Sequence, residues 1–214
     1  MILDKKWIRL YLVTDRTWLR EGEPLSHRVE LALQAGATMV QYREKHLKGD
    51  AYIEEARGIQ AVCRRYGVPF LLNDNVELAR ELDADGVHVG LEDMAVEKAV
   101  SILGPDKLVG ASAHNVEEAL AAQRSGASYL GCGAVFGSST KTNASFLERK
   151  ILEDICRAVH IPVAAIGGIT AENIHELYGC GADGVAVVSA VFAREDPREA
   201  VKFLLTEVSR LCCL

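Results

Sequence analysis

The sequence predicts an α/β fold, a (β/α)8 (TIM) barrel that forms a single domain over residues 1–214. Eight short apolar runs alternate with eight helical patterns along the chain. Nearly continuous apolar runs are typical of parallel strands that are buried on both faces. A short phrase, in which a small residue and Ala precede another small or acidic residue, recurs before every second run. Its intervals fit two βα units, as expected for a barrel of about 200 residues.

The predicted strands are these apolar runs. Four of them end the recurring phrases AGATMVQYR, DADGVHVG, SGASYLGCG and CGADGVAVVS, whose Gly and Asp residues suit the left-handed end of a preceding helix. The other four lie at residues 8–14, 68–73, 108–112 and 161–168. Pro69 and Pro162 stand at strand starts, where a missing N–H does least harm.

The predicted helices fill the intervals between the strands. Asp50 is expected to cap the second of them, whose apolar residues recur at helical spacing. The helices are expected at residues 27–34, 50–66, 76–82, 95–103, 116–125, 146–159, 173–178 and 197–211. A doubly wound sheet is the alternative fold, but no Gly-rich dinucleotide turn follows the first strand.

The composition bounds the function. About half of the residues are hydrophobic (49%) and 25% are charged, which suits a soluble globular chain. The net charge of −6 argues against broad nucleic-acid or membrane binding, so an anionic ligand would need a local basic cluster. No membrane-spanning run or signal peptide is evident, so we expect a cytoplasmic protein whose six cysteines are reduced. The sequence leaves a homo-oligomer open.

Two glycine-containing segments predict a phosphate site. In a barrel, the loops after the strands form the active face, and the last two loops often bind phosphate. The segment IGGIT contains Gly167 and Gly168, and VVSA contains Val188 and Ser189. Adjacent glycines allow backbone N–H groups to approach an anion. Two ordinary connections are the alternative interpretation.

The segment QYREK predicts a cationic face. Gln41, Arg43 and Lys45 occupy alternate positions, which share one face of a strand. The charges directly continue the buried run ATMV, so a merely solvated charge run is disfavoured. Buried cations require an anionic partner, and a diphosphate would serve.

Acidic residues after the third and fourth strands predict a Mg²⁺ site. Asn73, Asp74 and Asp93 lie at neighbouring strand ends, and Mg²⁺ prefers a few oxygen ligands together with substrate phosphates. Helix capping is the alternative for both carboxylates. His88 is interpreted as a structural strand residue and His114 stays ambiguous. The cysteines lack a companion histidine at zinc-binding spacing, which disfavours zinc and thiolate chemistry.

The segment GAVFGSSTKTNAS follows the sixth strand. It lacks the G-x-x-x-x-G-K-[ST] pattern of a P-loop, but it carries hydroxyls and one lysine on the expected active face. From the residues alone it could be a solvated linker or a loop that cradles a phosphate. The chemistry implied by the family resemblance described below favours a loop that closes over the site as a lid.

Taken in order, the motifs resemble one family over nearly the whole chain. The motifs are LYLVTD, QYREK, LLNDNVELA, ADGVHVG-LED, VGASAH, GAVFGSSTK, AIGGIT and ADGVAVVSA. They resemble thiamine-phosphate synthase. The resemblance implies a Mg²⁺-dependent barrel enzyme. It would join 4-amino-2-methyl-5-pyrimidinylmethyl diphosphate to 4-methyl-5-(2-phosphoethyl)thiazole, or its carboxylated form, and release diphosphate and thiamine monophosphate.

The resemblance also implies roles for individual residues, with Arg43, Lys45, Ser112 and Lys141 as the catalytic set. The family's diphosphate-binding residues match Gln41, Arg43, Lys45, Asn73 and Lys141, and its Mg²⁺ ligands match Asp74 and Asp93. Its pyrimidine-contacting serine matches Ser112, its thiazole-side hydroxyls match Ser138 and Thr140, and its thiazole-phosphate loops match Gly167, Gly168, Val188 and Ser189.

The implied mechanism ionises the C–O bond first, so that the aminopyrimidine stabilises a carbocation that the thiazole nitrogen then attacks. Basic residues and Mg²⁺ would stabilise the charge on the departing diphosphate. Three positions depart from the family's usual pattern. Ala134 replaces Pro, Ser138 replaces Thr and keeps the hydroxyl, and Asn143 replaces Asp. Ala134 and Asn143 bear on loop stiffness and substrate preference.

Three other functions compete with the synthase. A thiazole tautomerase has the same barrel, but its members tend to lack the diphosphate and metal residues that are present here. A phosphosugar isomerase would need an acid–base pair, for which Asp15, His88 and His114 are weak candidates. A ligand sensor on this scaffold would tolerate loss of Asp74 and Asp93.

Overall fold

The strands form a closed parallel barrel, which confirms the predicted fold. The structure is a computed structural model that describes residues 3–137 and 146–212. Each strand pairs with its neighbours in chain order, and β8 closes the barrel against β1. The strands are β1 (Leu10–Val13), β2 (Met39–Tyr42), β3 (Phe70–Asn73), β4 (Gly86–Val89), β5 (Leu108–Ala113), β6 (Tyr129–Gly133), β7 (Val163–Ile166) and β8 (Gly184–Val187).

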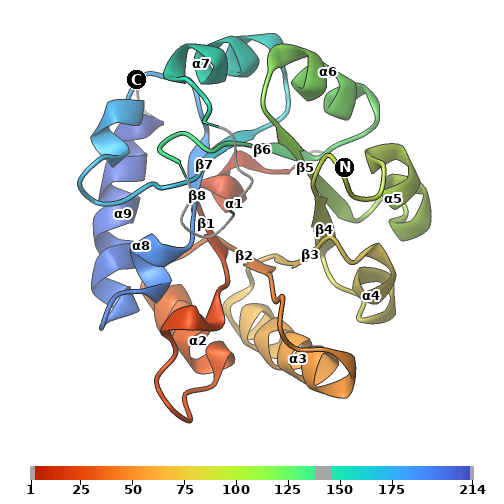
Figure 1. Ribbon diagram of the computed structural model, residues 1–214, viewed down its shortest axis with the longest axis vertical. Helices are drawn as coiled ribbons and strands as arrows, with labels where there is room; N and C mark the ends of the chain where they lie inside the picture. The colour runs from red at the N-terminus through yellow and green to blue at the C-terminus, as the bar shows by residue number, and fades with distance from the viewer. Residues whose placement is uncertain (1–2, 138–145, 213–214) are drawn as a thin grey trace.

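Helices surround the strands, as Figure 1 shows in a view along the barrel. The helices of the outer layer are α2 (Leu25–Gln34), α3 (Gly49–Tyr66), α4 (Val76–Glu81), α5 (Val96–Leu103), α6 (Val116–Arg124), α7 (Arg149–Ala158), α8 (Ser189–Phe192) and α9 (Pro197–Leu211). A short helix, α1 (Lys5–Ile8), precedes β1, and its Trp7 packs against the core inside the barrel. Two 3₁₀ turns, η1 (Arg16–Trp18) and η2 (Ile174–Leu177), complete the described elements.

Strand side chains alternate between two hydrophobic cores. Leu10 and Leu12 point outward into the larger core, which the helices cover, whereas Tyr11 and Val13 belong to the smaller core inside the barrel. This alternation follows from the two-residue period of a strand. A residue two positions after an interior residue therefore also faces the barrel axis, nearer the carboxyl end of its strand.

Several predicted boundaries were wrong. The first predicted strand included Ile8, which instead ends α1 after Asp4 caps that helix. Asp50 does not cap α3, because Lys48 occupies the cap position and Asp50 lies in the first turn. The helix predicted from residue 146 begins at Arg149, since the N–H of Leu147 is bonded to the carbonyl of Ala134.

The segment predicted as a helix over residues 173–178 forms only the 3₁₀ turn η2. The Asn173 side chain accepts a hydrogen bond from the N–H of Thr170 and donates one to the carbonyl of Gly168. These bonds hold the segment to the preceding loop. Three further short elements, α1, η1 and α8, were not predicted, and each is about one turn long.

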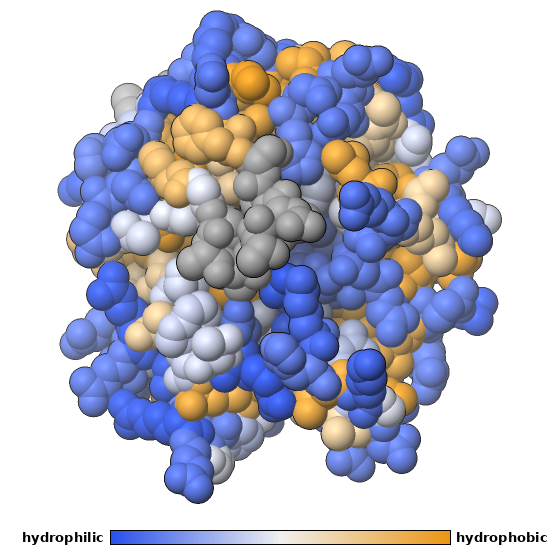
Figure 2. Space-filling model, in the orientation of Figure 1, coloured by the Kyte–Doolittle hydropathy of each residue, from blue (hydrophilic) through white to orange (hydrophobic). Residues whose placement is uncertain are grey.

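Polar side chains cover most of the face shown in Figure 2, and hydrophobic side chains form separate patches on it. Within the described part of the chain, no helix is both long and apolar enough to cross a bilayer.

Candidate active site

A cavity of about 570 Å³ opens at the carboxyl ends of the strands. Every strand contributes to its wall, from Val13 of β1 to Val187 of β8. The cavity also collects each predicted site residue that the structure describes, namely Gln41, Arg43, Lys45, Asn73, Asp74, Asp93, Ser112, Gly167, Gly168, Val188 and Ser189. Ser138, Thr140 and Lys141, and with them the predicted lid, lie outside the described residues.

The QYREK segment presents two cations to the cavity. The strand β2 ends at Tyr42, so only Gln41 lies on the strand, and Arg43 and Lys45 reach the cavity from the loop that follows. Within residues 3–137 and 146–212, neither Arg43 nor Lys45 forms a side-chain hydrogen bond or an ion pair within 4.0 Å. Two such cations on one cavity wall favour an anionic ligand.

Asp74 and Asp93 face each other across the ends of β3 and β4. Burial and the Asp93 carboxyl raise the pKa of Asp74 to about 6, and the Arg43 guanidinium opposes this shift. Asn73 donates a side-chain hydrogen bond to Asp74, and Asp93 accepts one of 2.8 Å from the N–H of Gly90. Two adjacent carboxylates and an amide make an all-oxygen donor set that fits Mg²⁺.

Helix capping does not account for either carboxylate. Asn75, not Asp74, caps α4 by accepting a hydrogen bond from the N–H of Leu78. Asp74 has a left-handed backbone with φ of 62°. The N-cap of α5 is Ala95, and it makes no side-chain cap bond. Both acidic side chains are therefore available to the cavity.

The described residues do not make a metal site from protein alone. Among them, no group of three or more His, Cys, Asp or Glu side chains gathers as it would around a zinc ion. Burial raises the pKa of the Cys63, Cys132, Cys156 and Cys180 thiols, so these thiols are poor nucleophiles.

A chain of buried polar groups joins two of the predicted binding residues across the barrel. Gln41 donates to the Tyr11 hydroxyl, which lies 2.7 Å from the Tyr129 hydroxyl. Tyr129 Oη lies 3.1 Å from His88 Nδ1, and His88 Nε2 lies 3.1 Å from Ser112 Oγ. The chain connects Gln41 to Ser112.

Burial raises the pKa of both tyrosines, so their hydroxyls remain protonated and can donate. One direction of donation satisfies every bond of the chain: Gln41 to Tyr11, Tyr11 to Tyr129, Tyr129 to His88 Nδ1, and His88 Nε2–H to Ser112. In that arrangement His88 accepts at Nδ1 and donates from Nε2.

Glycines make room for this chain. A Cβ on Gly110 would lie 2.2 Å from the Tyr129 ring, and one on Gly131 would lie 3.1 Å from His88 Cε1. Tyr11 and Tyr129 were not predicted as part of the site, and His88 was interpreted as a structural strand residue and a weak acid–base candidate. The spacing along the strands was the available signal. Tyr11, His88 and Tyr129 each precede a cavity-lining residue (Val13, Gly90 and Gly131) by two positions, and residues two apart share one face of a strand.

His114 was left ambiguous from the sequence. In the structure its Nδ1 lies 3.2 Å from a carboxyl oxygen of Glu118, which also accepts a hydrogen bond from the backbone N–H of His114. Both residues line the cavity. The pair belongs to the wall next to Ser112.

Gly167 and Gly168 directly follow β7 and line the cavity. Both have left-handed backbones, with φ of 101° and 63°. A Cβ on Gly167 would lie 2.5 Å from Ala134, and one on Gly168 would lie 2.6 Å from the carbonyl oxygen of Phe136. The glycines therefore allow the loop after β7 to pack on the loop after β6. No described residue accepts a hydrogen bond from the N–H of Gly167 or Gly168, so both donors remain for a ligand.

Comparison with known proteins identifies the family. Residues 10–191 match the family model described as thiamine monophosphate synthase. The chain belongs to this family. A thiamine-phosphate synthase from Chloroflexus aurantiacus is 48% identical over 204 residues, which are 94% of this chain and 93% of that protein. One from Methanobrevibacter smithii is 42% identical over 200 residues, or 94% and 95% of the two chains.

A solved structure agrees with this membership. Thiamine phosphate pyrophosphorylase from Pyrococcus furiosus superimposes with a TM-score of 0.87 at 39% identity, covering 97% of this chain and 98% of the other. These relatives of the thiamine monophosphate synthase family favour the synthase over the thiazole tautomerase.

Proposed function

We propose that this transferase joins a pyrimidinylmethyl diphosphate to a thiazole phosphate, giving thiamine monophosphate and diphosphate. The observation that carries the proposal is the juxtaposition, on one cavity, of the cations Arg43 and Lys45 with the carboxylates Asp74 and Asp93. A diphosphate bound with a divalent cation complements both sets of charges. Two phosphorylated substrates fit a cytoplasmic enzyme, and Cys63, Cys132, Cys156, Cys180 and Cys212 form no disulfide among the described residues.

The proposed chemistry begins with departure of the diphosphate. Arg43 and Lys45 stabilise the negative charge that develops on the leaving oxygen, and they do so at low reorganisation cost because the cavity is partly closed. Gln41 and Asn73 bind the same group, with Lys141 as a further cation. A benzyl-like carbocation on the pyrimidine is then attacked by the thiazole nitrogen.

Asp74 and Asp93 would hold Mg²⁺. When bound, the ion would neutralise charge on the diphosphate oxygens. The juxtaposed carboxylates of Asp74 and Asp93, which offer oxygen ligands beside the cations of the cavity, support this assignment.

The remaining residues orient the two substrates. The Ser112 hydroxyl, held by His88, would contact the pyrimidine. The N–H groups of Gly167 and Gly168, with Val188 and Ser189 beside them, would bind the phosphate of the thiazole. Ser138 and Thr140 would contact the thiazole, and closure of their loop would exclude water from the carbocation.

The decisive experiment mixes purified protein, both substrates and Mg²⁺ and measures thiamine phosphate. Product that depends on all three additions supports the proposal. Isomerisation of a thiazole carboxylate phosphate without condensation would assign the tautomerase instead. A Lys141→Ala variant with undiminished turnover would remove Lys141 from the diphosphate site.

A further inference from the structure

Glu44 stands between Arg43 and Lys45 in sequence, but of the three residues it alone lies outside the active-site cavity. Together with both cations, Glu44 lines a separate cavity of about 230 Å³ beside η1. The Glu44 side chain is only 1% exposed, so a buried carboxyl group lies in the loop that carries Arg43 and Lys45. A buried carboxylate is costly unless its charge is compensated, so its contacts indicate what it does.

The Glu44 carboxylate organises the loop that carries the cations. It accepts hydrogen bonds from the backbone N–H groups of His46 and, at 3.1 Å, of Leu47. These bonds curl residues 44–47 around the side chain. The loop conformation therefore depends on one carboxylate and not on regular secondary structure.

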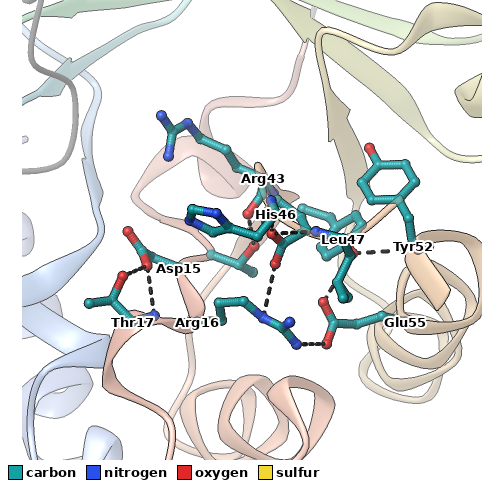
Figure 3. A network of polar contacts seen from close by, with 11 residues as sticks. Asp15, Arg16, Thr17, Arg43, His46, Leu47, Tyr52 and Glu55 are labelled. Atoms are coloured by element: carbon teal, nitrogen blue, oxygen red, sulfur yellow. Dashed lines mark hydrogen bonds and ion pairs between the residues drawn. The ribbon is translucent and has the colours of Figure 1, made fainter. Parts of the chain in front are cut away.

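Arg16 compensates the buried charge from the neighbouring loop. Its Nε lies 3.0 Å from Glu44 Oε2, without the alignment of a hydrogen bond, so the contact is an ion pair. Arg16 Nη2 lies 2.9 Å from Glu55 of α3, whose other carboxyl oxygen accepts a hydrogen bond of 3.0 Å from Tyr42 Oη. Figure 3 shows Arg43 extending away from the Arg16–Glu55 pair.

The start of the loop is held separately. Thr14, which is fully buried at the end of β1, accepts a hydrogen bond of 2.9 Å from the N–H of Arg43 and donates one of 3.2 Å to its carbonyl. Thr14 thus fixes the backbone of Arg43, and Glu44 fixes the backbone of His46 and Leu47, so Lys45 lies between two held points. A loop that is ordered before binding loses less conformational entropy when its side chains bind a ligand.

We propose that Glu44 is a positioning residue. Paired with Arg16, its buried carboxylate holds the loop so that the cations Arg43 and Lys45 face the active-site cavity and bind the diphosphate. This inference rests on the proposed function, because it takes the anion at these cations to be the diphosphate of the substrate. Glu44 itself does not contact the substrate.

The test compares Glu44→Ala, Glu44→Gln and wild type in two measurements. Calorimetry with Mg²⁺ and inorganic diphosphate gives a dissociation constant without turnover, and steady-state kinetics give a KM for each substrate. We expect Glu44→Ala to weaken diphosphate binding tenfold or more and to raise KM for the pyrimidine diphosphate by a similar factor. KM for the thiazole phosphate should stay within twofold of wild type.

Glu44→Gln retains an oxygen that can accept from the loop N–H groups, but it loses the charge that faces Arg16. We expect an intermediate, threefold to tenfold, loss of diphosphate binding. The Glu44→Gln variant also tests the proposal if Glu44→Ala does not fold. The matched control is Glu30→Gln, which removes a partly exposed carboxylate 2.7 Å from Arg65, between α2 and α3.

Two results would overturn the inference. One is diphosphate binding by folded Glu44→Ala within twofold of wild type. The other is an equal rise in both KM values together with a lowered melting temperature, which would indicate a general structural role. Wild type that binds diphosphate but forms no thiamine phosphate would contradict the proposed function alone.

Discussion

His88 Nε2 lies 3.1 Å from Ser112 Oγ, and the opposite nitrogen of the same ring lies 3.1 Å from the Tyr129 hydroxyl. The imidazole thereby joins the buried tyrosine pair to a serine on the cavity wall. The orientation of Ser112 depends on groups deep inside the barrel, not only on its own strand. Removing a tyrosine hydroxyl should therefore affect Ser112, and this effect can be measured.

Tyr129→Phe removes a hydroxyl that contacts both Tyr11 and His88. We expect the free energy of unfolding to fall by about 1–3 kcal/mol, because a buried hydrogen-bond partner is lost. We also expect a lower kcat/KM, since the imidazole that orients Ser112 is less constrained. Denaturant unfolding and steady-state kinetics measure the two effects. Tyr66→Phe, at a half-exposed tyrosine, should change neither, and an equally active Tyr129→Phe would separate the tyrosines from catalysis.

Asp74→Asn and Asp93→Asn each remove one negative charge from the proposed cation site. We expect the Mg²⁺ concentration for half-maximal activity to rise tenfold or more in each variant, because the site has few protein ligands. Chelation by EDTA should abolish wild-type activity and added Mg²⁺ should restore it. Asp83→Asn is the control, since Asp83 is exposed and paired with Lys107. Activity that persists after chelation would contradict the metal assignment.

Gly167→Ala tests the close packing of the loops after β6 and β7. The new Cβ would lie 2.5 Å from Ala134, so the two loops would have to separate. We expect a loss of about 1–3 kcal/mol beyond that of Gly179→Ala, together with a raised KM for the thiazole phosphate. Gly179 has a similar left-handed backbone, with φ of 75°, but open space around its Cβ position. Equal stability of the two variants would contradict the packing argument.

The ion pair between Glu23 and Arg28 predicts a pH dependence of stability. Arg28 is buried; it bonds the carbonyls of Phe192 and Arg194 and lies 3.0 Å from Glu23. The hydrogen bonds from Arg28 hold the pKa of Glu23 below its usual range. The stabilisation is thus fully present above the ordinary value of about 4.3 and is lost as the pH falls through the lowered one.

Glu23→Gln should therefore lower the free energy of unfolding by roughly 1.5–3 kcal/mol at neutral pH. The difference from wild type should shrink as the pH falls below about 4. Thermal or denaturant unfolding over a pH series measures it. The exposed pair Arg20–Glu195 provides a control in Glu195→Gln, for which little change is expected at any pH. A difference that is independent of pH would exclude the ion pair as its cause.

The barrel, and the gathering of the described candidate residues on one cavity, could be predicted because both depend on local patterns. Short apolar strands alternate with helices, and the barrel rule places strand-end residues such as Asn73 and Ser112 on one face. The residue that caps α4 could not be chosen from the sequence, because Asp74 and Asn75 are both suitable. The structure shows that the Asn75 side chain accepts from the N–H of Leu78, whereas Asp74 has a left-handed backbone.

The sequence by itself determined the fold class, the family and the ends of the strands from which the site is built. The tertiary structure decided which side chains meet. Gln41 and Ser112 are joined through Tyr11, Tyr129 and His88 only because β1, β2, β4, β5 and β6 face one barrel axis. Glu44 pairs with Arg16 because β1 and β2 are neighbours in the barrel, which places the loops that follow them side by side. No local spacing in the sequence encodes that contact.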